Sequence, residues 1–132
     1  MTEIPDFTRP APATWQSVHF AEEPPDAEAL RAAGVRVAEV DASRIEDKQN
    51  LMAALSDVLE LPDWFGGNWD ALDESLRDLG WLEASGHVIV MTRGEELWKR
   101  DPELAGMLVR SWIDAGGAWA DKGVPFHLVF VR

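Results

Sequence analysis

The chain has no cysteine among its 132 residues. Disulfide bonds, thiol nucleophiles and thiolate metal ligands are therefore excluded, and the composition is compatible with a reducing compartment. No basic segment followed by an apolar run occurs within the first residues, and no stretch of about 18 apolar residues occurs anywhere in the sequence. We therefore expect no signal peptide and no membrane span, and we predict a cytoplasmic location.

Positive charge is scarce, because 24 acidic residues stand against 12 basic ones and the formal net charge is −12. A field of this sign repels nucleic acids and anionic membranes, and it attracts basic surfaces. We therefore expect a basic protein as partner, with no nucleic acid and no membrane bound. Many acidic proteins carry such a charge only for solubility, which is the plainer interpretation of the charge when it is taken alone.

Motifs for catalysis and metal binding are missing. The three histidines, His19, His87 and His127, are scattered over predicted strands or their ends, and none belongs to an H-x-x-H pattern. No nucleophile elbow, no phosphate-binding P-loop and no dinucleotide-binding glycine pattern is present. We expect packed or edge histidines, no enzymatic activity, no cofactor and no metal site.

Hydrophobic periodicity predicts an α/β protein. The four predicted strands cover residues 15–20, 35–40, 87–92 and 124–131, and the last two are almost wholly apolar, as in strands covered on both faces. Helices are predicted over residues 27–33, 46–59, 68–79 and 103–122, with a helical turn at 95–98. Asp41 or Ser43 is expected to cap the second helix, and Asp101 followed by Pro102 the last one.

The predicted order of elements is β-α-β-α-α-β-α-β. Strands joined through helices pair in parallel with right-handed crossovers, so the sequence predicts a small parallel β-sheet with helices packed against it. Residues 15–132 are expected to form a single domain. Residues 1–14 contain Pro5, Pro10 and Pro12 among polar residues, and we expect them to form a disordered tail.

The segment LPDWFGGNWDAL at residues 61–72 combines aromatic, flexible and acidic residues. Trp64 and Phe65 stand before Gly66 and Gly67, and Asn68 can cap the helix that follows. Aromatic surface beside glycine and negative charge is typical of a docking site. Among the other tryptophans, those within helical patterns are expected to be packing residues, whereas Trp64 and Trp81 lie beside glycines in loops and are interface candidates. The expected packing residues are Trp69, Trp98 and Trp112.

The helix after this segment has two distinct faces. At about 100° per residue, one face carries three carboxylates and one arginine, and the opposite face carries an apolar stripe. The plainer interpretation of the charged face is a solvated surface with local ion pairs. The aromatic and glycine residues at the helix entry favour a docking surface instead. The charged face consists of Asp70, Asp73, Glu74 and Arg77, and the apolar stripe of Trp69, Leu72, Leu76 and Leu79.

The segment LPDWFGGNWDAL, followed by the helix DESLRDL and the pair Gly80-Trp81, resembles the barstar family of intracellular inhibitors of barnase-type ribonucleases. The resemblance covers roughly Val35 to Val131, and residues 1–34 form an extension that the compact family form lacks. It implies a barstar-like fold, in which a small parallel sheet has helices packed against it. This fold agrees with the element order predicted from periodicity.

In that family, the loop and the second helix plug the ribonuclease active site, and carboxylates stand where the substrate phosphate would lie. The resemblance therefore implies that Asp70 and Glu74 are charged anchors, Glu74 standing where the family's strongest-binding acid is an aspartate. Trp64 and Phe65 would supply apolar contact, and Gly66 would keep the backbone approachable. The full predicted partner-binding set is Trp64, Phe65, Gly66, Gly67, Asn68, Asp70, Asp73, Glu74 and Trp81.

Several positions depart from the family pattern. Glu74 keeps the charge of the family's aspartate but adds one methylene, Asp73 replaces an aromatic residue, and Gly67 replaces an acidic one. A further acid of the family, on the last long helix, corresponds to Ala118 here, with Asp114 one turn away as a possible substitute. These differences keep the general role and leave the target open.

The sequence therefore predicts a monomer that forms a 1:1 heterodimer with a basic ribonuclease of the extracellular type. An immunity or regulatory protein against a different basic partner or toxin is an alternative, because an acidic helix can block any basic site. A carboxylate-based hydrolase is a weaker alternative, since the acids have no histidine near them in the sequence. Three acids on one helix also could not enclose Mg²⁺ without ligands from other elements.

Overall fold

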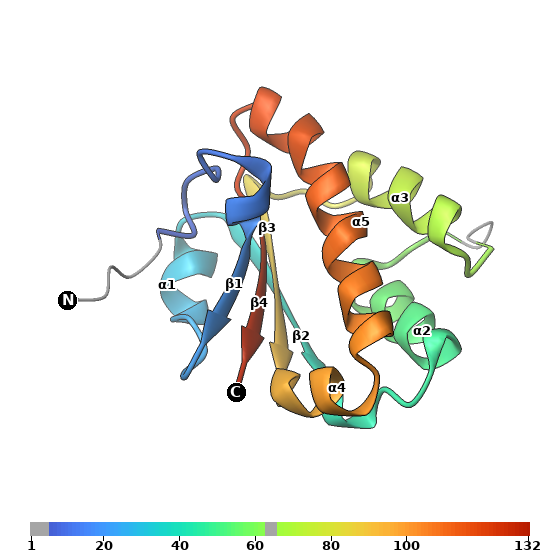
Figure 1. The fold of residues 1–132 in the computed structure, drawn as a ribbon. Coiled ribbons are helices and arrows are strands. Elements are labelled where there is room, and N and C mark those ends of the chain that lie inside the picture. The colour runs from blue at the N-terminus through green and yellow to red at the C-terminus, as the bar shows by residue number, and fades with distance from the viewer. Residues whose placement is uncertain (1–5, 63–65) are drawn as a thin grey trace.

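A computed structural model describes residues 6–62 and 66–132 (Figure 1). Its centre is a four-stranded sheet in the order β1-β4-β3-β2, and all three strand pairs are parallel. The predicted α/β class and the predicted parallel sheet are thus confirmed. The strands are β1 (Val18–Ala21), β2 (Val35–Asp41), β3 (Gly86–Thr92) and β4 (Phe126–Val131).

Helices cover the sheet unequally (Figure 1). Three helices pack on one face and enclose the larger core, whereas one short helix covers the other face together with a smaller core. The larger face carries α2 (Lys48–Leu59), α3 (Trp69–Asp78) and α5 (Pro102–Asp121), and the smaller face carries α1 (Ala27–Ala32). The helical turn predicted at residues 95–98 belongs to a full helix, α4 (Gly94–Arg100), which leads from β3 into α5.

The two central strands, β3 and β4, contribute apolar side chains to both cores. β4 is buried throughout and β3 is buried except at Thr92. Successive side chains of a strand point to opposite faces, so Ile89 enters the larger core and Val88 and Val90 enter the smaller one. Near-continuous apolar runs are what such strands require, and the sequence contains them.

Two local predictions are wrong. The first strand begins at Val18, because residues Thr14–Ser17 form a 3₁₀-helix before it. The cap of α2 is Asp47, whose side chain accepts a hydrogen bond from the Asn50 N–H at 2.8 Å. Asp41 ends β2 and caps a separate 3₁₀-helix at Ala42–Arg44, which the sequence pattern did not distinguish from α2.

The domain boundaries predicted from the sequence stay a prediction, and so does disorder over residues 1–14. Within that stretch the structure buries Phe7, which is 9% exposed and belongs to the smaller core. None of the helices in the described ranges combines the length and apolar character that a membrane crossing needs.

Candidate protein-binding site

Helix α3 begins at the predicted cap. The Asn68 side chain accepts a hydrogen bond from the Ala71 N–H at 2.8 Å, and this bond satisfies one of the free N–H groups of the first turn. Asp70 lies in that turn, where negative charge is stabilised by the helix dipole. The helix ends at Asp78, and the C-cap residue Leu79 adopts a left-handed conformation with φ of 48°. The chain therefore determines both ends of the helix locally.

The apolar face of α3 is fixed against the body of the protein. Leu72 and Leu76 are fully buried, and both belong to the larger core together with residues of α5. The indole N–H of Trp119, on α5, donates a hydrogen bond to the Leu76 carbonyl at 2.6 Å. Trp69 is partly buried and packs against the same core, in agreement with its predicted packing role. The helix therefore has a rigid base.

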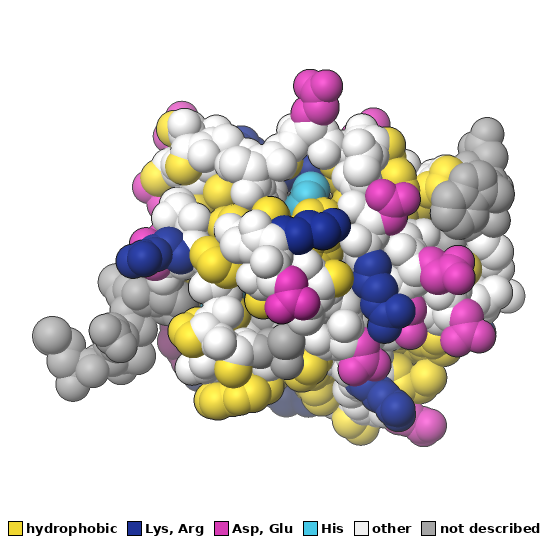
Figure 2. Space-filling view, turned by 90° about the horizontal axis from the view of Figure 1, so that it is seen from above, with side chains coloured by type: hydrophobic (Ala, Val, Ile, Leu, Met, Phe, Trp, Pro, Cys, Tyr) yellow, Lys and Arg dark blue, Asp and Glu magenta, His cyan; other side chains and the backbone are white. Residues whose placement is uncertain are grey.

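The opposite face of α3 presents charge. Asp70, Glu74 and Arg77 are exposed, as predicted. In the part of the chain that the structure describes, Arg77 forms no ion pair with Asp73 or Glu74. Figure 2 shows several acidic side chains, with Lys or Arg side chains among them, on the side of the molecule that carries α3, at the right of the view. The charged face is therefore not neutralised by local ion pairs.

Asp73 differs from the prediction that all three acids face solvent. Its side chain is only partly exposed, and its Oδ1 atom is buried without a hydrogen-bond partner in the described residues. Asp73 lies one residue after the buried Leu72, so the angular boundary between the two faces passes through it. The helical wheel placed it on the polar side but could not show how neighbouring elements cover that boundary.

The glycine loop and the helix exit complete the predicted surface. Gly67 adopts a φ of +67°, a left-handed conformation that favours glycine, while Gly66 is exposed. Trp64 and Phe65 lie outside the described residues, so their predicted contact role stays a prediction. Trp81 is 36% exposed, and its indole N–H donates to the Leu59 carbonyl at 2.9 Å.

That hydrogen bond gives Trp81 a structural role that the sequence did not indicate. The Leu59 carbonyl belongs to the last turn of α2, where carbonyl groups lack partners within the helix. Trp81 therefore links the exit of α3 to the end of α2 and still exposes part of its ring. On α5, Asp114 is exposed and Ala118 is half-buried.

The histidines are packed side chains. His87 and His127 are each 3% exposed, and His19 is half-buried. Burial lowers the pKa of His19 and of His87 to about 4, with smaller contributions from the neighbouring His127 and Arg36 respectively. Over residues 6–62 and 66–132, no group of three histidine, aspartate or glutamate side chains is placed to hold a metal ion.

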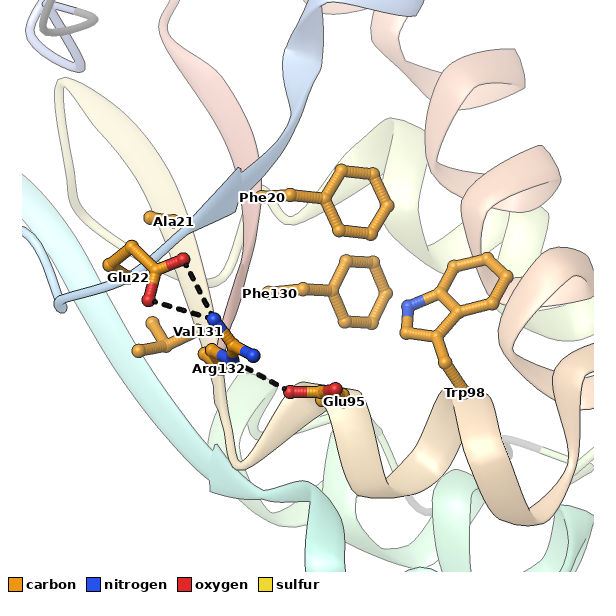
Figure 3. A pocket seen from close by; sticks show the side chains of 8 residues that line it. All are labelled: Phe20, Ala21, Glu22, Glu95, Trp98, Phe130, Val131 and Arg132. Atoms are coloured by element: carbon orange, nitrogen blue, oxygen red, sulfur yellow. Dashed lines mark hydrogen bonds and ion pairs between the residues drawn. The ribbon is translucent and has the colours of Figure 1, made fainter.

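A hollow of about 370 Å³ lies at the β1 edge of the sheet (Figure 3). In Figure 3, Phe20 and Phe130 extend side by side from neighbouring strands toward Trp98 on α4. The two phenyl rings stack with centroids 5.3 Å apart. Arg132 pairs with Glu95 at 3.1 Å and with Glu22 at 3.3 Å. Sequence reasoning missed this hollow because three distant segments form it.

A rigid parallel α/β domain with an unneutralised acidic helix is the arrangement expected of a protein-binding domain. The sequence pattern of the Barstar (barnase inhibitor) family matches residues 35–131, and the chain belongs to this family. The resemblance predicted from the sequence is thus confirmed. The match runs from β2 to β4, so β1 and α1 precede it. Curated proteins give no match to the chain. Membership supports a general role as an inhibitor that binds a ribonuclease, and not as an enzyme.

Proposed function

We propose that the protein acts inside the cell as an inhibitor of a barnase-type ribonuclease and occludes its basic active site with α3 and the glycine loop. One observation carries this proposal. Asp70 and Glu74 are exposed on a helix whose other face is buried in the core, and no described basic residue forms an ion pair with either of them.

The chemistry of the target supports this surface. A ribonuclease site must hold a polyanion, so it presents arginine, lysine and histidine side chains. Carboxylates form strong, charge-assisted hydrogen bonds with such groups. Asp70 and Glu74 are four residues apart on one helical face, so the backbone separates them by about 6 Å along the axis. Two distinct cationic groups of the target can therefore each receive one carboxylate.

Rigidity and overall charge support it as well. A helix anchored through Leu72, Leu76 and the bond from Trp119 to the Leu76 carbonyl loses little freedom when it binds, so less of the interaction free energy is spent on ordering. The net charge of −12 speeds encounter with a basic enzyme, and salt weakens this effect. Inhibition should therefore be fastest at low ionic strength.

The alternative is an immunity or regulatory protein whose basic partner is a different enzyme or toxin. Glu74 favours it in one respect, because its extra methylene places the carboxylate farther from the helix than the aspartate of the family pattern would. A partner that binds Glu74 needs a cationic site that lies deeper below its surface than one that binds an aspartate at this position. Such a partner would bind through the same exposed face of α3.

The test is a titration of residual RNA cleavage by a panel of barnase-type ribonucleases, at low and moderate salt. The site variant is Asp70→Asn with Glu74→Gln. The control is Glu28→Gln with Glu39→Gln, which changes two exposed acids on α1 and β2. Both double variants change the net charge by the same amount, so long-range steering is matched between them.

We expect stoichiometric inhibition by the native protein and by the control, and its loss in the site variant. Equal weakening of both double variants would show that net charge alone is responsible and would contradict the proposed surface. If no ribonuclease of the panel is inhibited, the ribonuclease target is wrong, and a pull-down of basic proteins then tests the alternative partner.

A further inference from the structure

The first described residues lie against the sheet at β1 and β4 (Figure 1). We call residues 6–13 the strap; they precede the part of the chain that matches the family. Phe7 anchors the strap, because its ring stands edge-on to two histidine rings of the sheet. The centroid of Phe7 is 4.8 Å from that of His19, on β1, and 5.2 Å from that of His127, on β4.

A chain of two hydrogen bonds joins the strap to these histidines. The His127 Nε2 atom is 2.7 Å from the backbone carbonyl oxygen of Arg9, and the His127 Nδ1 atom is 2.9 Å from the Nε2 atom of His19. A carbonyl oxygen can only accept, so His127 Nε2 must carry a proton. In a neutral His127, Nδ1 then accepts, and His19 Nε2 must donate to it. The geometry thus assigns both tautomers when both rings are neutral.

The same geometry limits how many protons the pair can take up. One extra proton is tolerated, because a protonated Nδ1 of His127 can donate to Nε2 of His19 once His19 carries its own proton on Nδ1. A second proton is not tolerated. Both facing nitrogens would then carry hydrogen atoms directed at each other across 2.9 Å, and two positive charges would be adjacent.

The surroundings add little that would hold two cations together. A cavity of about 810 Å³ lies between the strap and the sheet, and its titratable lining groups are Asp6, Arg9, His19 and His127. Burial lowers the pKa of His127, and the hydrogen bond to the Arg9 carbonyl and the charge of Asp6 raise it by less. On the same face of β3 and β4, the neighbours of the pair in register are Val88 and Val129.

We propose that the strap is a proton-sensitive latch, closed over the sheet while the His19–His127 pair is neutral and released when both rings are protonated. The sheet itself stays paired, because β1 and β4 are joined by backbone hydrogen bonds that do not titrate. Release uncovers the imidazole rings and the site that Phe7 occupies in the smaller core. Since α3 lies on the other side of the molecule, this event is separate from the proposed inhibitory surface (Figure 1).

The test is amide hydrogen exchange followed by mass spectrometry from pH 7 to pH 4, corrected for the intrinsic exchange rate. In the strap, the N–H groups of Thr8 and Arg9 donate hydrogen bonds to Asp6. We expect these two amides to lose protection below about pH 5, by up to tenfold per pH unit for each proton taken up. Strand β3 serves as the internal reference, and it should stay protected to a lower pH than the strap, because its amides exchange only through global unfolding. Loss of protection in both segments at the same pH would mean general unfolding and would overturn the latch.

The matched variant is His19→Gln with His127→Gln. A glutamine amide can donate and accept as the neutral imidazole does, but it does not titrate in this range. We expect the strap of this variant to remain protected at pH 4.5. Release at the same pH as in the native protein would contradict the proposal. His87→Gln is the control, because His87 packs beside Trp119 and not against the strap. The pH at which the strap is released should be the same in this variant as in the native protein.

A second measurement tests the latch even if the strap of the double variant is already open at neutral pH. NMR titration of the native protein follows the Cε1 protons of His19 and His127 together with the amide signals of the strap. The latch requires the strap signals to change over the same pH interval as the second proton uptake by the pair. Strap signals that change without histidine titration, or histidines that both titrate while the strap stays bound, would refute it.

Discussion

Trp119 and Leu76 are joined by a buried hydrogen bond, from the indole N–H to the carbonyl oxygen at 2.6 Å, that links α5 to the last turn of α3. The bond uses a carbonyl of the helix that carries the proposed inhibitory face. Any loss of this contact therefore acts on the geometry of that face, although no atom of Trp119 belongs to it.

Trp119→Phe should lower the free energy of unfolding by about 1–3 kcal/mol, because the replacement leaves a buried carbonyl group with one hydrogen bond fewer. The measurement is urea unfolding. Trp98→Phe is the control, since the Trp98 indole nitrogen is buried without a hydrogen-bond partner in the described residues. A loss in the control as large as that in Trp119→Phe would show that ring size, and not the hydrogen bond, accounts for the effect.

Leu72→Ala should lower the free energy of unfolding by about 2–5 kcal/mol, because the side chain is fully buried in the larger core and its truncation leaves a cavity. Asp70→Ala, two residues earlier and exposed, should cost less than about 1 kcal/mol. Thermal unfolding followed by circular dichroism measures both. Equal destabilisation by the two variants would contradict the assignment of the two faces of α3.

Asp73→Ala should leave the free protein as stable as before or more stable, by up to about 1 kcal/mol. The reason is that Oδ1 of Asp73 is buried without a hydrogen-bond partner in the described ranges, and this costs free energy in the folded state. If the target ribonuclease donates a hydrogen bond to the Asp73 carboxylate, the same variant should also inhibit the enzyme less well. Chemical unfolding and inhibition are therefore measured on one preparation. A marked loss of stability would show that the buried oxygen has a stabilising partner.

The stability of the protein should fall as the pH drops from about 6.5 toward 4. Burial lowers the pKa of His87 to about 4, so over this interval the unfolded chain binds a proton that the folded one does not. The free energy of unfolding then decreases by up to about 1.4 kcal/mol per pH unit from this group, and the slope vanishes below pH 4. His87→Gln should flatten this part of the profile. Identical pH profiles for variant and native protein would exclude His87 as a source.

The sequence predicted those elements whose signals are local. The apolar runs of β3 and β4 identified buried parallel strands, and the spacing of Leu72, Leu76 and Leu79 identified the buried side of α3. Asn68 and Asp101 predicted two helix starts because a capping side chain bonds to backbone only three residues away. The same reasoning failed at the start of α2, because Asp41 caps the 3₁₀-helix Ala42–Arg44 and Asp47 is the cap of α2.

What the sequence could not show depends on contacts between distant segments. His19 and His127 are 108 residues apart, and no spacing rule connects them or relates them to Arg9. The position of Trp81 beside a glycine predicts a loop residue, and nothing in the sequence indicates its hydrogen bond to the Leu59 carbonyl. The burial of Asp73 likewise depends on tertiary packing at the boundary of a helical face. Each of these cases involves a polar group whose partner, or lack of one, is decided by the fold.

The sheet order β1-β4-β3-β2 has a consequence for how the chain folds. It places the first strand beside the last one, so β1 has no partner until residues 126–131 have been synthesised. Pairings between such distant residues close a large loop and form slowly, whereas β2 and β3 need only the intervening helices. The edge formed by β1 should therefore assemble last, after a core of β2, β3 and their helices already exists. During synthesis, the residues of β1, His19 and Phe20 among them, thus remain unpaired for longer than the other strands of the sheet.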